Sequence, residues 1–165
     1  MLYNVCIISI RFLTEVKSPM KATEGSMGRI FVIRLEDGDV VPACLEEFAA
    51  ENGINVGFVT IIGGMAEGNI VTGPRKSDEM PPDPMLTAVE GAHEVMGTGV
   101  IALDEAGQPK LHLHAALGRS DKVIGGCLRP GVKTWLVGEV IICEILGVTS
   151  KRVFDERSRF PLLEP

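Results

Sequence analysis

The sequence predicts an α+β domain with a mostly antiparallel sheet and one clear helix near its N-terminal side. Residues 41–49 carry apolar side chains at helical spacing, whereas most of the following chain is a series of short β-rich runs between glycine and proline turns. The chain has 165 residues, of which 45% are hydrophobic and 23% charged. These values are typical of one globular domain that can bury a core without disulfides.

The helix is predicted from its ends as well as from its spacing. Asp39 follows the turn at residues 36–38 and is expected to cap the helix, with Pro42 tolerated in the first turn. Asn52 and Gly53 close it, because glycine readily adopts the left-handed conformation that ends a helix.

The remaining elements are predicted to be strands. Gly63–Gly64 marks a turn or a close backbone approach, and residues 73–85, rich in proline and charge, form the one clear loop. Residues 132–148 are long enough for a helix, but their valine and isoleucine content and Gly138 favour a strand. No clear periodicity is visible in residues 151–165. The predicted strands are 28–35, 54–63, 66–72, 86–90, 93–103, 110–117, 122–128 and 132–148.

The chain divides into three parts: an N-terminal extension (1–26), the domain (27–148) and a C-terminal tail (149–165). The extension begins apolar and becomes polar before the first clear strand. It is either loosely attached or precedes a true start at Met20 or Met27.

Charge and cysteine content restrict the function. The net charge of −6 disfavours duplex DNA, and the densest basic stretch, Lys151–Arg159, is interleaved with acids and is interpreted as a solvated tail. The four cysteines fit neither a CxxC pair nor a secreted disulfide framework, which favours a reducing cytoplasm. The apolar run at 2–10 is too short to cross a bilayer and lacks the flanks of a signal peptide, so no membrane association is expected.

His112 and His114 form the most informative constellation. On a strand, residues two apart point to the same face, where two imidazoles can share a metal. A turn centred on Arg119–Ser120 would place Cys127 opposite His112 and complete a His/His/Cys set suited to zinc. A turn one residue longer would send Cys127 to the other face, which leaves His93 or water as the third ligand. The predicted metal ligands are therefore His112, His114 and Cys127.

The other chemical signals are weaker. Glu67 and Glu94 could act as acids or bases, but each is more typical of a solvated carboxylate. The chain contains no phosphate-binding GxxxxGK[ST] loop, no dinucleotide fingerprint at Gly63–Gly64 and no GxSxG nucleophile elbow.

Several ordered segments together resemble the PPC (plants and prokaryotes conserved) domain. They are GRIFVIRLEDGDVV, CLEEFAAENGI, GFVTIIGGM, HEVMGTGVIAL, and PKLHLHAALG followed by VIGGCLRPG. The resemblance covers roughly residues 27–148 and implies an α+β fold that assembles as a tight homotrimer.

The resemblance also bears on DNA and metal. Plant members carry AT-hook motifs with an Arg-Gly-Arg core, which this chain lacks, so a DNA-binding role does not carry over. Stand-alone prokaryotic members resemble metal proteins with an HxH pair and a third histidine in a GGH segment. Here the pair corresponds to His112 and His114, and the third position is Cys127.

Two functions follow from these expectations. The first is an oligomeric interaction or regulatory module with a zinc site. The second rests on a distant similarity to acetolactate decarboxylases, which hold zinc with an HxH pair and a further histidine. It is a metal-dependent lyase or hydrolase acting on a small carbonyl substrate. Its candidate acid, base and substrate-binding residues would be Glu67, Glu94, Arg119 and Arg129.

Overall fold

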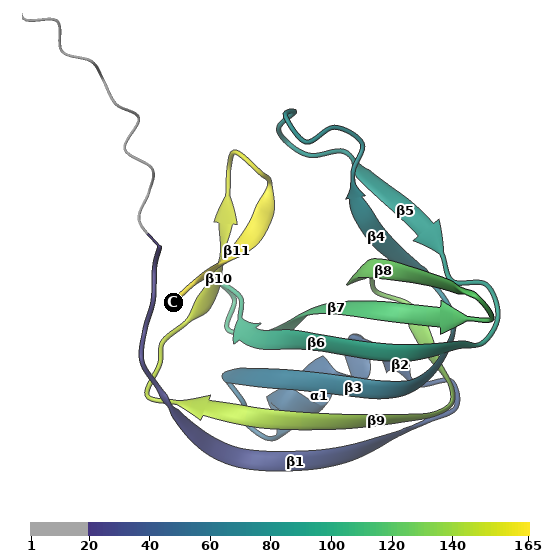
Figure 1. Cartoon of the computed structure of the whole chain (residues 1–165). Coiled ribbons are helices and arrows are strands. Elements are labelled where there is room, and N and C mark those ends of the chain that lie inside the picture. Colours follow the sequence, from purple (N-terminus) through teal and green to yellow (C-terminus); the bar gives the residue numbers. More distant parts are fainter. Residues whose placement is uncertain (1–19) are drawn as a thin grey trace, which may run out of the picture.

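A computed structural model describes residues 20–165 and shows a twisted, mostly antiparallel sheet with one helix (Figure 1). The hydrogen-bonded strand order is β1-β9-β3-β6-β7-β8-β4-β5; β2 pairs with β9, and β10 pairs with β6 and β11. The apolar run at 2–10 and Cys6 lie outside the described residues. The elements are β1 (Ser26–Glu36), β2 (Val40–Val41), α1 (Ala43–Glu51), β3 (Val56–Glu67), β4 (Asn69–Pro74), β5 (Pro84–Ala88), β6 (His93–Leu103), β7 (Pro109–Arg119), β8 (Lys122–Leu128), β9 (Val132–Leu146), β10 (Lys151–Asp155) and β11 (Phe160–Glu164).

The predicted fold class is confirmed, and several strands have the bounds that the sequence predicts. Strands β6 and β8 begin and end at the expected residues, and the ambiguous run after Gly131 is the strand β9. The helix also ends as expected, with Asn52 as its C-cap and Gly53 at a φ of +66°.

The start of the helix differs from the prediction. Helix α1 begins at Ala43, its N-cap is Pro42, and no side chain caps it. Asp39 instead accepts a hydrogen bond from the backbone N–H of Glu36 at 2.8 Å and so stabilises the preceding turn. The carboxylate satisfies a nearer donor, and Pro42 in the N-cap position has no side-chain oxygen to offer the first turn of the helix.

Strand β3 does not turn at Gly63–Gly64 but continues to Glu67. The glycines mark a close approach to β9, because a Cβ atom on Gly64 would lie 2.3 Å from the carbonyl oxygen of Trp135. The register between β3 and β9 shifts at this point. The second of the two predicted alternatives, close backbone approach, is therefore correct.

The C-terminal residues form a hairpin rather than an irregular tail. Strands β10 and β11 pair from Lys151 to Glu164, and β10 touches the sheet through one parallel pair between Lys151 and Leu103. This hairpin and the β4–β5 hairpin stand away from the main sheet at its two ends (Figure 1).

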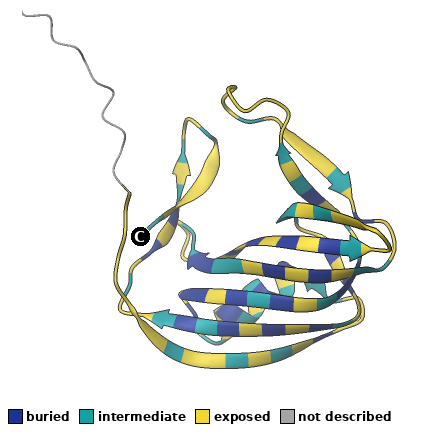
Figure 2. Ribbon diagram, in the orientation of Figure 1, coloured by how far each residue is buried: buried dark blue, intermediate teal, exposed yellow. Residues whose placement is uncertain are grey.

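The sheet has two different faces, visible as alternating dark and light residues along the strands (Figure 2). The inner face packs against α1, whose Leu45 and Ala49 are buried in the same core as Ile61, Leu113 and Ile142. Within residues 20–165, no helix covers the outer face. Large apolar side chains remain exposed there: Ile30, Val32, Phe58, Ile62, Met96 and Ile141.

No helix within residues 20–165 combines the length and apolar character needed to cross a membrane.

Candidate metal centre

Strand β7 presents the histidine pair on the outer face of the sheet. Its residues alternate strictly: Leu111, Leu113 and Ala115 are buried, while His112 and His114 are exposed. The buried residues anchor the strand in the core, and the two-residue period then places both imidazoles on the opposite side. The local sequence LHLHA therefore fixes the direction of both rings.

The third residue comes from the neighbouring strand β8. The hairpin turn is formed by Ser120 and Asp121, because Arg119 pairs with Lys122, and Ser120 has a φ of +56°. This register places Cys127 opposite His114.

The predicted pairing of Cys127 with His112 is therefore wrong, although the predicted face is correct. The turn centre lies one residue further along the chain than assumed, between Ser120 and Asp121, so the cross-strand partner of every residue shifts by two positions. Side chains alternate with a period of two, so Cys127 stays on the face that carries both histidines.

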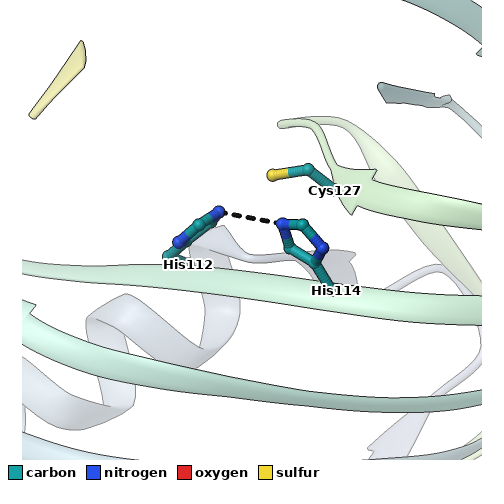
Figure 3. Close-up of side chains that lie close together, drawn as sticks. All are labelled: His112, His114 and Cys127. Atoms are coloured by element: carbon teal, nitrogen blue, oxygen red, sulfur yellow. Dashed lines mark hydrogen bonds between the residues drawn. The ribbon is translucent and has the colours of Figure 1, made fainter. Parts of the chain in front are cut away.

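The three side chains converge (Figure 3). One donor atom from each of His112, His114 and Cys127 lies within 4.8 Å of the others, and the two Nε2 atoms are 3.1 Å apart. In a tetrahedral zinc site, bonds of about 2.0–2.1 Å to nitrogen and about 2.3 Å to sulfur place donor atoms roughly 3.3–3.6 Å from one another. The set present thus fits zinc in donor type and needs only small side-chain movements. Without a metal, one ring can donate the Nε2–H hydrogen bond to the other.

The surroundings favour a neutral imidazole and an uncharged thiol. Desolvation, followed by repulsion from Arg152, His114 and Arg129, lowers the pKa of His112. Desolvation raises the pKa of Cys127, and the positive charges of Arg129 and Arg152 partly oppose that rise. His112 is therefore ready to bind a cation, whereas Cys127 must lose its proton to do so.

A pocket of about 310 Å³ opens beside the histidine pair. Phe58, Val100 and Leu163 give it apolar walls, and Thr98 and Arg152 add polar groups. Its volume lies at the lower end of the range for small-molecule sites. The pocket joins the central strands of the sheet to the C-terminal hairpin, since Leu163 belongs to β11 and Arg152 to β10.

Arg152 is the site residue that sequence reasoning missed. It was interpreted as part of a solvated basic tail, but it is 6% exposed. Its Nη2 donates to the carbonyl oxygen of Val100 at 2.8 Å, and its Nε donates to that of Lys110 at 3.3 Å. The interpretation failed because burial depends on where the β10–β11 hairpin docks. The neighbouring Lys151, Arg157 and Arg159 are exposed, as expected.

His93 lies at the other end of β6. Val100, the partner of His112, is seven residues further along this strand, roughly 23 Å away at about 3.3 Å per residue. The Nδ1 atom of His93 lies 2.8 Å from the carbonyl oxygen of Gly91, and the ring lines a separate pocket of about 450 Å³. The structure therefore does not bring His93 to the pair.

The other candidates for acid, base or substrate binding are mostly remote. Glu67 forms an ion pair with Lys133, and Arg119 donates to the carbonyl oxygen of Glu90. Glu94 is exposed and pairs with Gly118 near the far end of β7. Of the four named candidates, only Arg129 influences the site, through its charge on His112 and Cys127.

Comparison with known proteins gives a family and a set of similar structures. The family model described as the Plants and Prokaryotes Conserved (PCC) domain matches residues 22–146. A metal-containing protein from Archaeoglobus fulgidus is 25% identical, with a TM-score of 0.76 over 88% of this chain and 100% of that one. None of the curated proteins matches the chain.

Two further solved structures share the fold. A plant- and prokaryote-conserved (PPC) protein from Pyrococcus horikoshii is 23% identical, with a TM-score of 0.76 over 88% of this chain and 98% of that one. A protein from Ralstonia eutropha JMP134, named as a candidate DNA-binding protein, also has this fold. It is 21% identical, with a TM-score of 0.67 over 81% of this chain and 90% of that one.

Proposed function

Because the chain belongs to the Plants and Prokaryotes Conserved (PPC) domain family, we propose that it is a cytoplasmic, oligomeric PPC module with a zinc site on His112, His114 and Cys127. Its role in this proposal is protein interaction or regulation rather than DNA binding. Although the family is often labelled DNA-binding, this chain has a net charge of −6 and no AT-hook.

One observation carries the metal proposal: three soft or borderline donor atoms lie within 4.8 Å of one another. Two of the residues stand on β7 and the third on β8, and the strands are joined by a two-residue turn. The donors are therefore held on a rigid hairpin rather than on a loop, which favours a specific site. Imidazole and thiolate are ligands that select zinc over magnesium or calcium. The name of the Archaeoglobus protein, which says that it contains metal, agrees with this proposal.

The partner in this proposal is a second and a third copy of the same chain. Two of the cross-strand rows on the outer face are largely apolar between β1 and β3. One row runs from Ile30 through Phe58 to His112, and the other runs from Val32 through Ile141 to His114. Exposed apolar areas of this kind mark association surfaces. The family resemblance implies a homotrimer, so the proposed occupant of this face is the same chain.

The test is elemental analysis of freshly purified protein, combined with its mass in solution. Wild type should contain zinc in stoichiometric amount, and the double variant His112→Ala/His114→Ala should contain none. Cys127→Ser should bind zinc much more weakly, because a hydroxyl is a poor replacement for a thiolate. His93→Ala is the matched control, since it removes a histidine remote from the pair, and should retain full zinc. Zinc retained by the double variant would refute the site.

A second function is favoured by the pocket beside the metal residues. The exposed imidazoles and the cavity of about 310 Å³ would leave a coordination position open to a small molecule. A zinc ion there would supply Lewis acidity toward a carbonyl group, as in a lyase or hydrolase. X-ray absorption would separate the two functions: a fourth protein ligand favours the structural module, and a water ligand favours the enzyme.

A further inference from the structure

Arg152 carries a buried positive charge without an acidic partner. Its side chain is 94% shielded from solvent, yet within residues 20–165 no carboxylate forms an ion pair with it. The charge of the Glu46 carboxylate acts on Arg152, but both oxygens of Glu46 are already used by the backbone N–H of Leu111 and the Nζ of Lys110. Burying an unpaired charge costs free energy, so such a charge is usually kept for a ligand or a reaction.

The hydrogen bonds of Arg152 aim the guanidinium rather than neutralise it. Nη2 and Nε donate to the carbonyl oxygens of Val100 and Lys110, which fixes the plane of the group against the ends of β6 and β7. Nη1 donates to no atom in the described part of the chain, and the side chain lines the pocket beside His112 and His114. Both N–H groups of Nη1, on a permanently charged group, are thus left without an acceptor among the described residues.

The walls of the pocket restrict the kind of anion. Phe58, Val100 and Leu163 are apolar, so they suit a short hydrocarbon chain, and Thr98 adds one hydroxyl. A phosphate dianion would require charged donors around several oxygens, whereas the lining of this pocket supplies one permanent positive charge, Arg152. A volume of about 310 Å³, at the lower end of the range for small-molecule sites, suits a small organic ligand.

We propose that Arg152 binds the carboxylate of a small organic monocarboxylate whose carbon chain lies against Phe58 and Leu163, next to the metal residues. This inference rests on the proposed zinc site only for the presence of a metal ion at the histidine end of the pocket. The charge and hydrogen bonding of Arg152 support the carboxylate contact with or without a metal. Arg152 is thus a ligand-binding residue, separate from the three metal ligands.

The test uses the full chain and calorimetric titration with butyrate, its neutral isostere butyramide and inorganic phosphate. Wild type should bind butyrate at least tenfold more tightly than either of the other two probes. Arg152→Gln should lose at least tenfold in butyrate affinity while its zinc content, measured on the same sample, equals that of wild type. Arg152→Lys should lie between them, since lysine retains the charge but not the planar fork.

The outcomes separate this inference from the metal proposal. Wild type that contains zinc but does not distinguish butyrate from butyramide overturns the inference and leaves the zinc site standing. Wild type that lacks zinc but prefers butyrate in an Arg152-dependent manner overturns the zinc site and leaves the inference standing. Phosphate bound more tightly than butyrate overturns the carboxylate assignment. Should Arg152→Gln fail to fold by circular dichroism, the butyrate-to-butyramide ratio in wild type and Arg152→Lys decides.

Discussion

The two faces of the sheet are built from alternate residues of the same strands, yet they meet different surroundings. On β3, Ile61 is 1% exposed beneath the helix, while the adjacent Ile62 is 49% exposed on the outer face. Both are isoleucines, so neither residue type nor strand propensity explains the difference. The inner face is closed by α1 within the chain, and the outer face is left for other molecules. The inner face therefore determines the fold, while the outer face carries both candidate functions, assembly and metal binding.

Charged groups follow the same division. At the edge of the inner face, Glu144 is buried and fully paired: Arg29 donates to it from Nε at 2.8 Å and from Nη2 at 2.7 Å. Beside the outer face, Arg152 is equally buried but has no acidic partner. Removing one partner of a buried ion pair destabilises a protein, because it leaves a buried charge uncompensated. A buried charge that has no partner likewise lowers the free energy of unfolding. The contrast distinguishes Arg29, which pairs with an acid inside the chain, from Arg152, which has N–H donors available to a ligand.

The largest expected effect tests the two faces directly. Replacing Ile61 by Ala should lower the free energy of unfolding by about 2–5 kcal/mol, because it opens a cavity in a closed core. Replacing Ile62 by Ala should cost less than half as much, since this side chain is already half exposed. Urea unfolding at one protein concentration measures both. Equal losses would mean that the outer face is as tightly packed as the core, which a trimer with Ile62 at its centre would produce.

The second effect concerns assembly. Replacing Val32, which is 84% exposed on the outer face of the edge strand β1, by Asp should dissociate a trimer, because it places a charge against apolar partners. The control is Ala43→Asp in the first turn of α1, on the other side of the molecule, where an acid is favourable. Light scattering should give three times 17.7 kDa for wild type and the control, and a monomer for Val32→Asp. A monomeric wild type at micromolar concentration would end the trimer proposal.

The third effect is a change in acid stability. The hydrogen bonds from the side chain and backbone of Arg29 lower the pKa of Glu144 to about 2 from its ordinary value of 4.5. A carboxyl whose pKa falls on folding contributes stability that is full above its unfolded pKa. That contribution is lost as the pH falls from about 4.5 toward about 2. Glu144→Gln should therefore flatten the decline in melting temperature over this interval.

Arg29→Gln provides the matched variant for this measurement. It should flatten the same interval, but it should also lower the melting temperature near neutral pH, because it leaves Glu144 buried without its partner. If the acid decline is unchanged in both variants, the pair contributes nothing to pH-dependent stability.

The inner face was the more predictable of the two from sequence. The flanking turns identified β6 and β8 to the residue, and the alternation in LHLHAAL, which burial on one side imposes, identified β7 almost as closely. The two-residue period also placed His112, His114 and Cys127 on one face, even though the assumed cross-strand pair was wrong. A property that depends only on parity survives a register error of two residues.

What could not be predicted depends on docking. The sequence KRVFD gives no alternation that separates a buried arginine from a solvated one, so Arg152 was assigned to the tail. Its burial results from the position of the β10–β11 hairpin beside β6, and within residues 20–165 one strand-ladder pair, Lys151 with Leu103, joins the hairpin to the sheet. The start of α1 was predicted wrongly for a similar reason. The carboxylate of Asp39 could accept from the backbone N–H of Glu36 or from one in the first turn of the helix, and the sequence does not decide between them.

The smallest expected effect is on DNA, where we predict no tight, specific binding to a duplex. Duplex affinity comes largely from cations that neutralise phosphates, and it requires them to be free and grouped on one surface. In the described part of the chain, seven cations are instead held in ion pairs, among them Arg34 with Glu36 and Lys133 with Glu67. Arg152 is buried, and the outer face between β1 and β3 is apolar rather than basic.

A gel-shift titration at nanomolar protein and physiological salt should therefore show no retarded band, and Val32→Asp should behave as wild type does. A band that weakens in Val32→Asp would instead make the outer face a nucleic-acid surface and would remove the division of roles between the two faces.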